Sequence, residues 1–113
     1  MGQDGSSQMG LEDISMFRSV LNSTILYPSD ANSAIQQLKL LHGQKGINYL
    51  RTTRATLPVL YTTEETKSMK IGGSKILRQS QNDKAVDFTT GDTLHKAAQH
   101  TQNPKNTTYS VQT

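Results

Sequence analysis

The 113-residue chain contains no cysteine and no tryptophan. Without cysteine there is no disulfide framework, no thiolate metal site and no cysteine nucleophile, which excludes several classes of enzyme. No stretch approaches the roughly 18 consecutive apolar residues needed to cross a bilayer, and residues 1–4 lack the charged and apolar pattern of a signal peptide. We therefore expect a cytoplasmic protein with no membrane partner.

Apolar residues are also few. Only 33% of the residues are hydrophobic, and adding the 8 glycines leaves the share below the roughly 45–50% of typical soluble domains. Ala, Val, Ile, Leu, Met, Phe and Tyr together number 25 in positions 1–61 but 12 in positions 62–113. Since the length suits one ordinary domain or two partial ones, we expect a thin core and a first half that folds better than the second.

Basic residues only slightly outnumber acidic ones. The chain has 12 basic and 9 acidic residues, which give a net charge of +3 and a pI near 9.3. The basic residues are scattered rather than gathered in a stripe, and 2 phenylalanines and 4 tyrosines offer few rings on which bases stack. This pattern argues against nucleic acid as a partner. A non-catalytic module that binds polyanions or another protein is kept as an alternative function.

A strand, a helix and a second strand are predicted between positions 24 and 51. Residues 24–27 form a short β-branched and apolar run, and residues 47–51 form another. Between them, residues 31–41 carry apolar side chains at helical spacing, with Ser29 or Asp30 as a candidate cap and Gly43 as a candidate left-handed end. This order predicts two parallel strands joined by a right-handed crossover, which is the unit of α/β sheets.

The flanking segments give weaker signals. Apolar residues at helical spacing predict a helix over residues 7–21, capped at Ser6 or Ser7. Residues 55–68 show no sustained period and are interpreted as a linker. Beyond the linker we expect a hairpin of residues 69–71 and 75–77 around a Gly-Gly-Ser turn, a weak strand at 85–88, a helix from Asp92 or Thr93 through Ala98, and a frayed tail at 106–113.

Candidate binding residues follow the two parallel strands, because such sheets bind ligands beyond the carboxyl ends of their strands. Arg51 and Arg54 lie three apart at the end of the second strand, where guanidinium groups can hold a phosphate or a carboxylate. From spacing alone, a pair of solvated charges is the favoured interpretation. For Asp30, and for Asp4 in the turn-like segment 4–7, helix capping is favoured.

Two further patterns are interpreted as structural. His95 and His100 are five residues apart, which does not place them on one helical face, so we expect surface histidines rather than metal ligands. The segment 72–75 (GGSK) lacks the upstream glycine of a phosphate-binding loop and is predicted to be a turn. Composition and spacing thus predict a partial α/β domain with a candidate anion site, and no particular reaction.

Five short segments in the first half of the chain occur in a fixed order: 4–9 (DGSSQM), 11–19 (LEDISMFRS), 27–30 (YPSD), 45–46 (KG) and 51–54 (RTTR). This series resembles the transketolase family, in particular its animal-type and transketolase-like members. The resemblance implies an α/β fold: the later half of a parallel-sheet pyrimidine domain, which binds thiamine diphosphate, at 1–54, a linker at 55–68, and a truncated α/β C-terminal domain at 69–113.

The resemblance also implies a function. The family transfers a two-carbon ketol unit between sugar phosphates in the pentose phosphate pathway, using thiamine diphosphate and a divalent metal, magnesium or calcium. In the family, the residue matching Asp4 contacts sugar hydroxyls, the one matching Gln8 lines the substrate channel, and the one matching Arg54 grips the sugar phosphate. We expect no catalytic, cofactor-binding or metal-binding residue in this chain.

Departures from the family pattern concern the cofactor. We expect the glutamate that activates the aminopyrimidine ring and the diphosphate-binding domain with its metal ligands to be absent, so that the cofactor site is incomplete. Gln3 stands where the family usually has glutamate, and Ser6 and Ala55 stand where it usually has proline. The sequence therefore predicts a chain that is inactive alone and that pairs with itself or with a complete transketolase.

Overall fold

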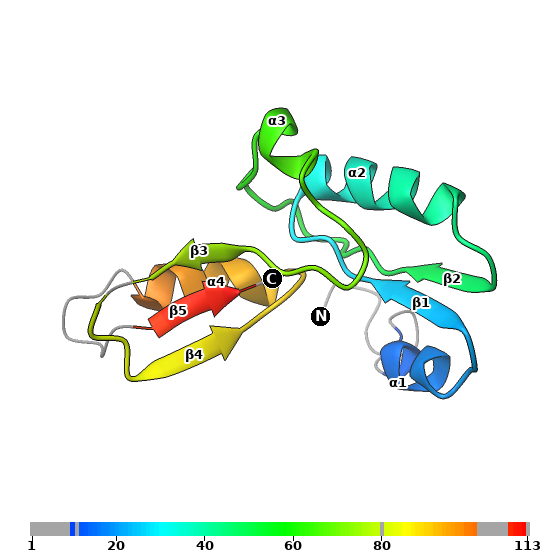
Figure 1. Ribbon diagram of the computed structural model, residues 1–113, viewed down its shortest axis with the longest axis horizontal. Coiled ribbons are helices and arrows are strands. Elements are labelled where there is room, and N and C mark those ends of the chain that lie inside the picture. Colours follow the sequence, from blue (N-terminus) through cyan, green and yellow to red (C-terminus); the bar gives the residue numbers. More distant parts are fainter. Residues whose placement is uncertain (1–9, 11, 80, 102–108, 113) are drawn as a thin grey trace.

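Two small sheets, each with its own helix, form two lobes in the computed structural model (Figure 1). The structure describes residue 10 and residues 12–79, 81–101 and 109–112. The molecule measures 42 × 34 × 27 Å, and its radius of gyration of 15.3 Å exceeds the about 13 Å typical of one domain of this length. The elements are, in order, α1 (Asp13–Arg18), β1 (Ser23–Leu26), α2 (Ala31–His42), β2 (Ile47–Leu50), α3 (Thr63–Thr66), β3 (Ile76–Arg78), β4 (Ala85–Phe88), α4 (Thr93–Thr101) and β5 (Tyr109–Gln112).

The first lobe contains the predicted strand, helix and strand. β1 and β2 pair in parallel, with Ser23 opposite Ile47 and Leu26 opposite Leu50. α2 connects them and lies along one side of the pair (Figure 1). The α/β fold class and the parallel pairing are therefore confirmed.

Among the described residues of this lobe, the left-handed ones are Asn22 and Gly46, which directly precede β1 and β2, and not Gly43 at the end of α2. Gly43 caps the helix with φ of −89°, so the predicted left-handed cap is wrong. Gly46 has φ of +94°, and a Cβ atom there would lie 2.5 Å from the carbonyl oxygen of Asn22. The chain needs glycine where it turns closely past the start of β1, because any larger residue would meet that carbonyl.

α1 is shorter than the helix predicted over residues 7–21. It begins at Asp13, and its N-cap residue Glu12 makes no side-chain capping hydrogen bond. At the other end, the hydroxyl of Ser23 donates to the carbonyl of Phe17 at 2.6 Å, which binds a helix carbonyl to the start of β1. The predicted caps Ser6 and Ser7 lie outside the described residues, and the helix does not reach back to them.

The predicted linker contains one helical turn, α3, which the periodicity analysis missed. Thr62 accepts from the backbone N–H of Glu65, and the Glu65 carboxylate accepts from the backbone N–H of Thr62. This reciprocal capping box satisfies two donors that an isolated turn would leave without partners. The Thr-x-x-Glu spacing was the signal, but four residues are too few to show a helical period.

The second lobe has a three-stranded sheet in the order β3, β5, β4. β5 pairs antiparallel with β3 and parallel with β4, so residues 109–112 form the central strand of this sheet. The predicted fraying of the tail is wrong for these four residues. The predicted hairpin is also wrong, because residues 69–71 are not a strand and β3 finds its partner in the distant β5.

The core is thin, as the composition predicts. Among the described residues the buried hydrophobic side chains are Leu41, Tyr61 and Leu94. Tyr61 and Leu94 pack together, with Met69, Leu77 and Ala97 around them. In this cluster Tyr61, from the predicted linker, packs against Leu94 of α4, so it joins the two halves of the chain.

Candidate functional site

The two loops at the carboxyl edge of the parallel sheet lie side by side. The backbone N–H of Arg51, just after β2, donates to the carbonyl of Leu26 at the end of β1 at 2.9 Å. The chain then bends at Arg54, whose side chain is exposed. The predicted gathering of polar loops at this edge is therefore observed.

Arg51 is occupied by contacts within the protein. Its Nη1 lies 3.2 Å from Oδ1 of Asp13, and its Nη2 donates to the carbonyl oxygen of Gly10 at 3.2 Å. Its guanidinium carbon also lies 5.1 Å from the centroid of the Tyr27 ring. The favoured interpretation of a pair of solvated charges is therefore wrong for Arg51, because its guanidinium group pairs with Asp13, with the Gly10 carbonyl and with the Tyr27 ring.

Asp13 holds α1 against β2. The hydroxyl of Tyr49 donates to Oδ2 of Asp13 at 2.6 Å, and the Tyr49 ring stacks on Phe17 with the ring centroids 4.0 Å apart. The hydrogen bond from Tyr49, backed by the charge of Arg51, lowers the pKa of Asp13 despite its burial. The same hydrogen bond raises the pKa of Tyr49. The carboxylate is thus committed to a structural contact.

Asp30 is a cap, as predicted, but it also has a second role. It is 6% exposed, and its Oδ1 accepts from the backbone N–H of Ser33 at 2.7 Å. Its Oδ2 accepts from the N–H groups of Leu60 and Tyr61 at 2.7 and 2.8 Å. Burial by itself raises the pKa of Asp30, but the hydrogen bonds from Ser33, Tyr61 and Leu60 outweigh it and lower the pKa overall. One carboxylate therefore caps α2 and fixes the linker to it.

The turn after β1 carries the contact between the lobes, which the sequence analysis did not find. The Tyr27 hydroxyl donates to Oδ1 of Asp92 at 3.0 Å, and the Tyr27 carbonyl accepts from the Thr90 hydroxyl at 2.7 Å. Nε2 of His95 lies 2.7 Å from the carbonyl oxygen of Ser29 and donates to it. His95 is therefore half-buried and bonded, which corrects the prediction of a surface histidine.

The remaining predicted site residues are only partly placed. Arg54 lies at the expected edge, whereas Asp4 and Gln8 fall outside the described residues. In the part of the chain that the structure describes, no group of three or more His, Asp or Glu side chains could hold a metal ion.

Two parallel strands joined by a helix, with polar loops at their carboxyl edge, place the first lobe among α/β domains with a parallel sheet. The family model described as the transketolase pyrimidine-binding domain matches residues 1–59. The chain therefore belongs to the transketolase family, as the sequence resemblance implied.

Individual relatives agree with this assignment. Transketolase-like protein 1 of Bos taurus is 47% identical over 97 residues, which cover 86% of this chain and 16% of that protein. Human transketolase is 39% identical over 97 residues, which cover 86% of this chain and 15% of that protein. The chain thus spans about one sixth of the length of the curated relatives it matches.

Solved structures show the same fold. Transketolase from Pichia stipitis in complex with sedoheptulose 7-phosphate superposes with a TM-score of 0.80 at 21% identity, over 98% of this chain and 17% of that one. The superposition includes both lobes. The division of the chain at 1–54, 55–68 and 69–113 stays a prediction, since the family model extends to residue 59.

Proposed function

We propose that this chain keeps the sugar-phosphate side of a transketolase site and does not transfer ketol units by itself. The observation that carries the proposal is the position of Arg54, which is exposed at the carboxyl edge of the parallel sheet. Arg51, three residues earlier, is held by Asp13 and fixes the start of this loop. Arg54 would therefore be presented from an anchored loop to a phosphate group.

The proposed roles of the three site residues follow the family resemblance. Arg54 grips the phosphate of the sugar, because a guanidinium group matches phosphate oxygens with two parallel donors. Asp4 accepts hydrogen bonds from sugar hydroxyls, and Gln8 lines the channel through which the sugar enters. The substrate class is sugar phosphates of the pentose phosphate pathway, handled in the cytoplasm.

The cofactor site is proposed to be incomplete in this chain. Thiamine diphosphate with magnesium or calcium would supply the carbanion chemistry when bound. The described residues offer no cluster of metal ligands, and Asp13 and Asp30 are already committed to structural hydrogen bonds.

A partner chain is proposed to supply the rest of the site, either a second copy or a complete transketolase. Parallel sheets are normally covered on both faces and flanked by further strands. In the first lobe, apolar side chains are instead left accessible: Leu21 is 86% exposed, Leu38 60% and Ile35 56%. Apolar surface of this kind is typical of a protein interface.

A turnover assay tests the proposal directly. The purified chain, with thiamine diphosphate, magnesium and a ketose and aldose phosphate pair, is expected to show no ketol transfer above a heat-killed control. Turnover by the lone chain would refute the proposed incompleteness. Sedimentation of the chain alone and mixed with complete transketolase would then report which partner it takes, and a monomer under both conditions contradicts the partner proposal.

Binding of ribose 5-phosphate tests the role of Arg54. Arg54→Gln is expected to weaken binding about tenfold or more, because hydrogen bonds to charged groups are worth roughly 1.5–3 kcal/mol. Arg18→Gln is the matched control, since Arg18 is exposed at the end of α1. Equal effects of the two substitutions would show a general charge effect and would exclude a specific phosphate contact.

The alternative, a module that binds polyanions, is favoured only by the net charge of +3. Part of that charge is internally compensated, because Arg51, Lys67 and Lys75 form salt bridges with Asp13, Glu64 and Glu65. Filter binding of RNA against salt separates the two functions. A steep fall of affinity with salt supports the alternative, since each phosphate contact releases counterions.

A further inference from the structure

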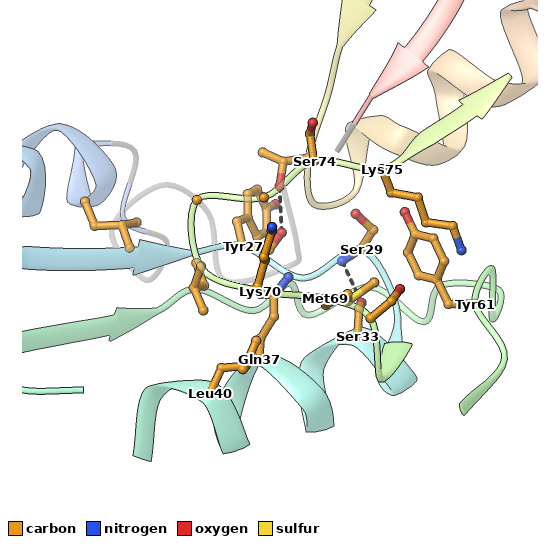
Figure 2. Close-up of a pocket in the computed structure, with 16 residues that line it drawn as sticks. Tyr27, Ser29, Ser33, Gln37, Leu40, Tyr61, Met69, Lys70, Ser74 and Lys75 are labelled. Carbon is orange, nitrogen blue, oxygen red and sulfur yellow. Dashed lines mark hydrogen bonds between the residues drawn. The ribbon is translucent and has the colours of Figure 1, made fainter. Parts of the chain in front are cut away.

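The side of α2 that faces the solvent is apolar. Figure 2 shows Ser33, Gln37 and Leu40 on the other side of this helix, where they line a cavity. Successive residues of a helix turn by about 100°, so Ile35 and Leu38 lie opposite these three, and they are 56% and 60% exposed. A surface helix normally carries polar residues on its outer side. α2 therefore presents apolar side chains both to the rest of the molecule and to the solvent.

A positive charge adjoins these apolar side chains. Lys39 follows Ile35 by four residues in the last turn of α2, so the two side chains are neighbours on the helix surface. Lys39 is exposed, and its ammonium group has no ionic partner among the described residues. We call Ile35, Leu38 and Lys39 the α2 patch. It is an apolar surface with an uncompensated positive charge beside it.

A second exposed apolar surface lies at α1. Met16 is 60% exposed, Val20 is 38% exposed, and Leu21, the next residue, is 86% exposed. Glu12 precedes Met16 by four residues, and its carbonyl accepts from the backbone N–H of Met16 at 2.9 Å, so their side chains are neighbours. Glu12 is exposed and has no ionic partner in the described part of the chain. These four residues, which we call the α1 patch, combine an apolar surface with an uncompensated negative charge.

The two patches lie on opposite sides of the first lobe. Figure 1 shows α2 on one side of β1 and β2 and α1 on the other, and the stacked rings of Phe17 and Tyr49 hold α1 against β2. The patches of one molecule therefore cannot cover each other. Between two molecules, an α1 patch and an α2 patch have opposite charges, whereas two patches of the same kind would bring like charges together.

We propose that copies of this chain associate head to tail, with the α1 patch of one copy on the α2 patch of the next. Met16 packs against Ile35 of the neighbouring copy, and Glu12 faces its Lys39. A contact between two different surfaces leaves one free patch at each end of a pair, so it produces rings or open chains rather than a closed dimer. The inference rests on the partner chain proposed above and names a second copy as that partner.

Sedimentation velocity of the 113-residue chain tests the proposal at concentrations up to about 1 mM, a range that detects even weak association. We expect the average sedimentation coefficient to rise with concentration and to pass the value of a dimer. A monomer at every concentration would overturn the inference. A plateau at the dimer would overturn it as well, because a head-to-tail dimer still has one free patch of each kind.

Two variants locate the contact. Met16→Gln and Ile35→Gln are each expected to weaken self-association about tenfold or more, because the contact loses a buried apolar group. Val86→Gln, at a valine of β4 that is 53% exposed, is the matched control and should associate like the unsubstituted chain. An equal mixture of the first two variants should form a dimer of one copy of each, since each supplies the patch that the other lacks. A mixture that associates as weakly as the separate variants would overturn the assignment.

Charge reversal tests the pairing of Glu12 with Lys39. Glu12→Lys and Lys39→Glu are each expected to weaken self-association roughly threefold to tenfold, because each places two like charges at the contact. The chain with both substitutions should regain association, since every contact then has its two charges exchanged. Failure of this double variant to recover would overturn the proposed contact, and circular dichroism confirms that each variant is folded.

Further outcomes keep this inference apart from the proposed function. Arg54→Gln should self-associate like the unsubstituted chain, because Arg54 belongs to neither patch. A chain that is monomeric alone but sediments with complete transketolase would overturn head-to-tail association and leave the proposed partner in place. Head-to-tail association by a chain that does not bind ribose 5-phosphate would support this inference and contradict the proposed role of Arg54.

Discussion

The carboxylate of Asp30 is expected to be one of the largest single contributors to stability in this molecule. Asp30→Ala removes the cap of α2, at about 0.5–2 kcal/mol, and leaves the N–H of Tyr61 buried without an acceptor, at about 1–3 kcal/mol. The N–H of Leu60 loses its partner as well, but Leu60 is 38% exposed and water can reach this region. The expected loss in the free energy of unfolding is therefore about 2–4 kcal/mol.

Urea unfolding followed by circular dichroism measures this loss. Glu12→Ala is the matched control, because Glu12 is the N-cap of α1 but makes no capping hydrogen bond, and we expect a change within about 0.5 kcal/mol. Asp30→Asn should fall between the two, since asparagine caps helices well but offers only one acceptor oxygen. If Asp30→Ala and Glu12→Ala cost the same, Asp30 does not join the linker to α2 as described.

Three other perturbations test the remaining contacts. Gly91→Ala should lower the free energy of unfolding in a urea titration by about 2–4 kcal/mol, because φ of Gly91 is +62° and the new Cβ would meet the Tyr27 ring. Gly43→Ala is the control, and it should be neutral or stabilising because the space around Gly43 is open. Arg51→Met should cost about 1–3 kcal/mol by leaving Asp13 with one fewer partner, and an equally stable variant would contradict the ion pair. Because folding lowers the pKa of Asp13, its carboxylate contributes fully to the free energy of unfolding above the ordinary carboxyl pKa of about 3.9, and this contribution is lost as the pH falls through the pKa of the folded state. In a plot of the free energy of unfolding against pH, Asp13→Asn should therefore flatten the fall at acid pH. An unchanged fall would refute this reasoning.

The first lobe was predictable because its signals are local. The spacing of apolar residues in 31–41, the cap at Asp30 and the apolar runs on either side all act within a few residues of one another. Parallel pairing of the two strands then follows from the crossover rule. The same reasoning placed Arg54 at the carboxyl edge of the sheet.

The second lobe was not predictable in the same way, because its order depends on distant pairing. β3 and β4 meet only through β5, which begins more than 20 residues after the end of β4. Residues 109–112 (YSVQ) do alternate apolar and polar side chains, but four residues in a polar tail are too few to predict a strand, and they do not show which strands β5 pairs with. The sequence therefore favoured a nearby hairpin over the pairing that the structure contains.

Prediction of the site from the sequence was limited because its contacts join residues that are far apart in the chain. The sequence placed Arg51 and Arg54 three residues apart after the second strand, but it did not show that Asp13, 38 residues before Arg51, forms an ion pair with it. It also gave no sign that His95 would reach the carbonyl of Ser29. Such pairs are set by how the lobes pack, and a single sequence carries no direct signal for them.

Tyr27 contacts both the loop after β2 and the second lobe. Its ring lies beneath the guanidinium group of Arg51, its hydroxyl donates to Asp92, and its carbonyl accepts from Thr90. Arg51 begins the loop that presents Arg54, whereas Asp92 and Thr90 belong to the second lobe. Tyr27 therefore contacts both the residue that begins the loop to Arg54 and the residues at the start of α4, through its side chain and its backbone carbonyl.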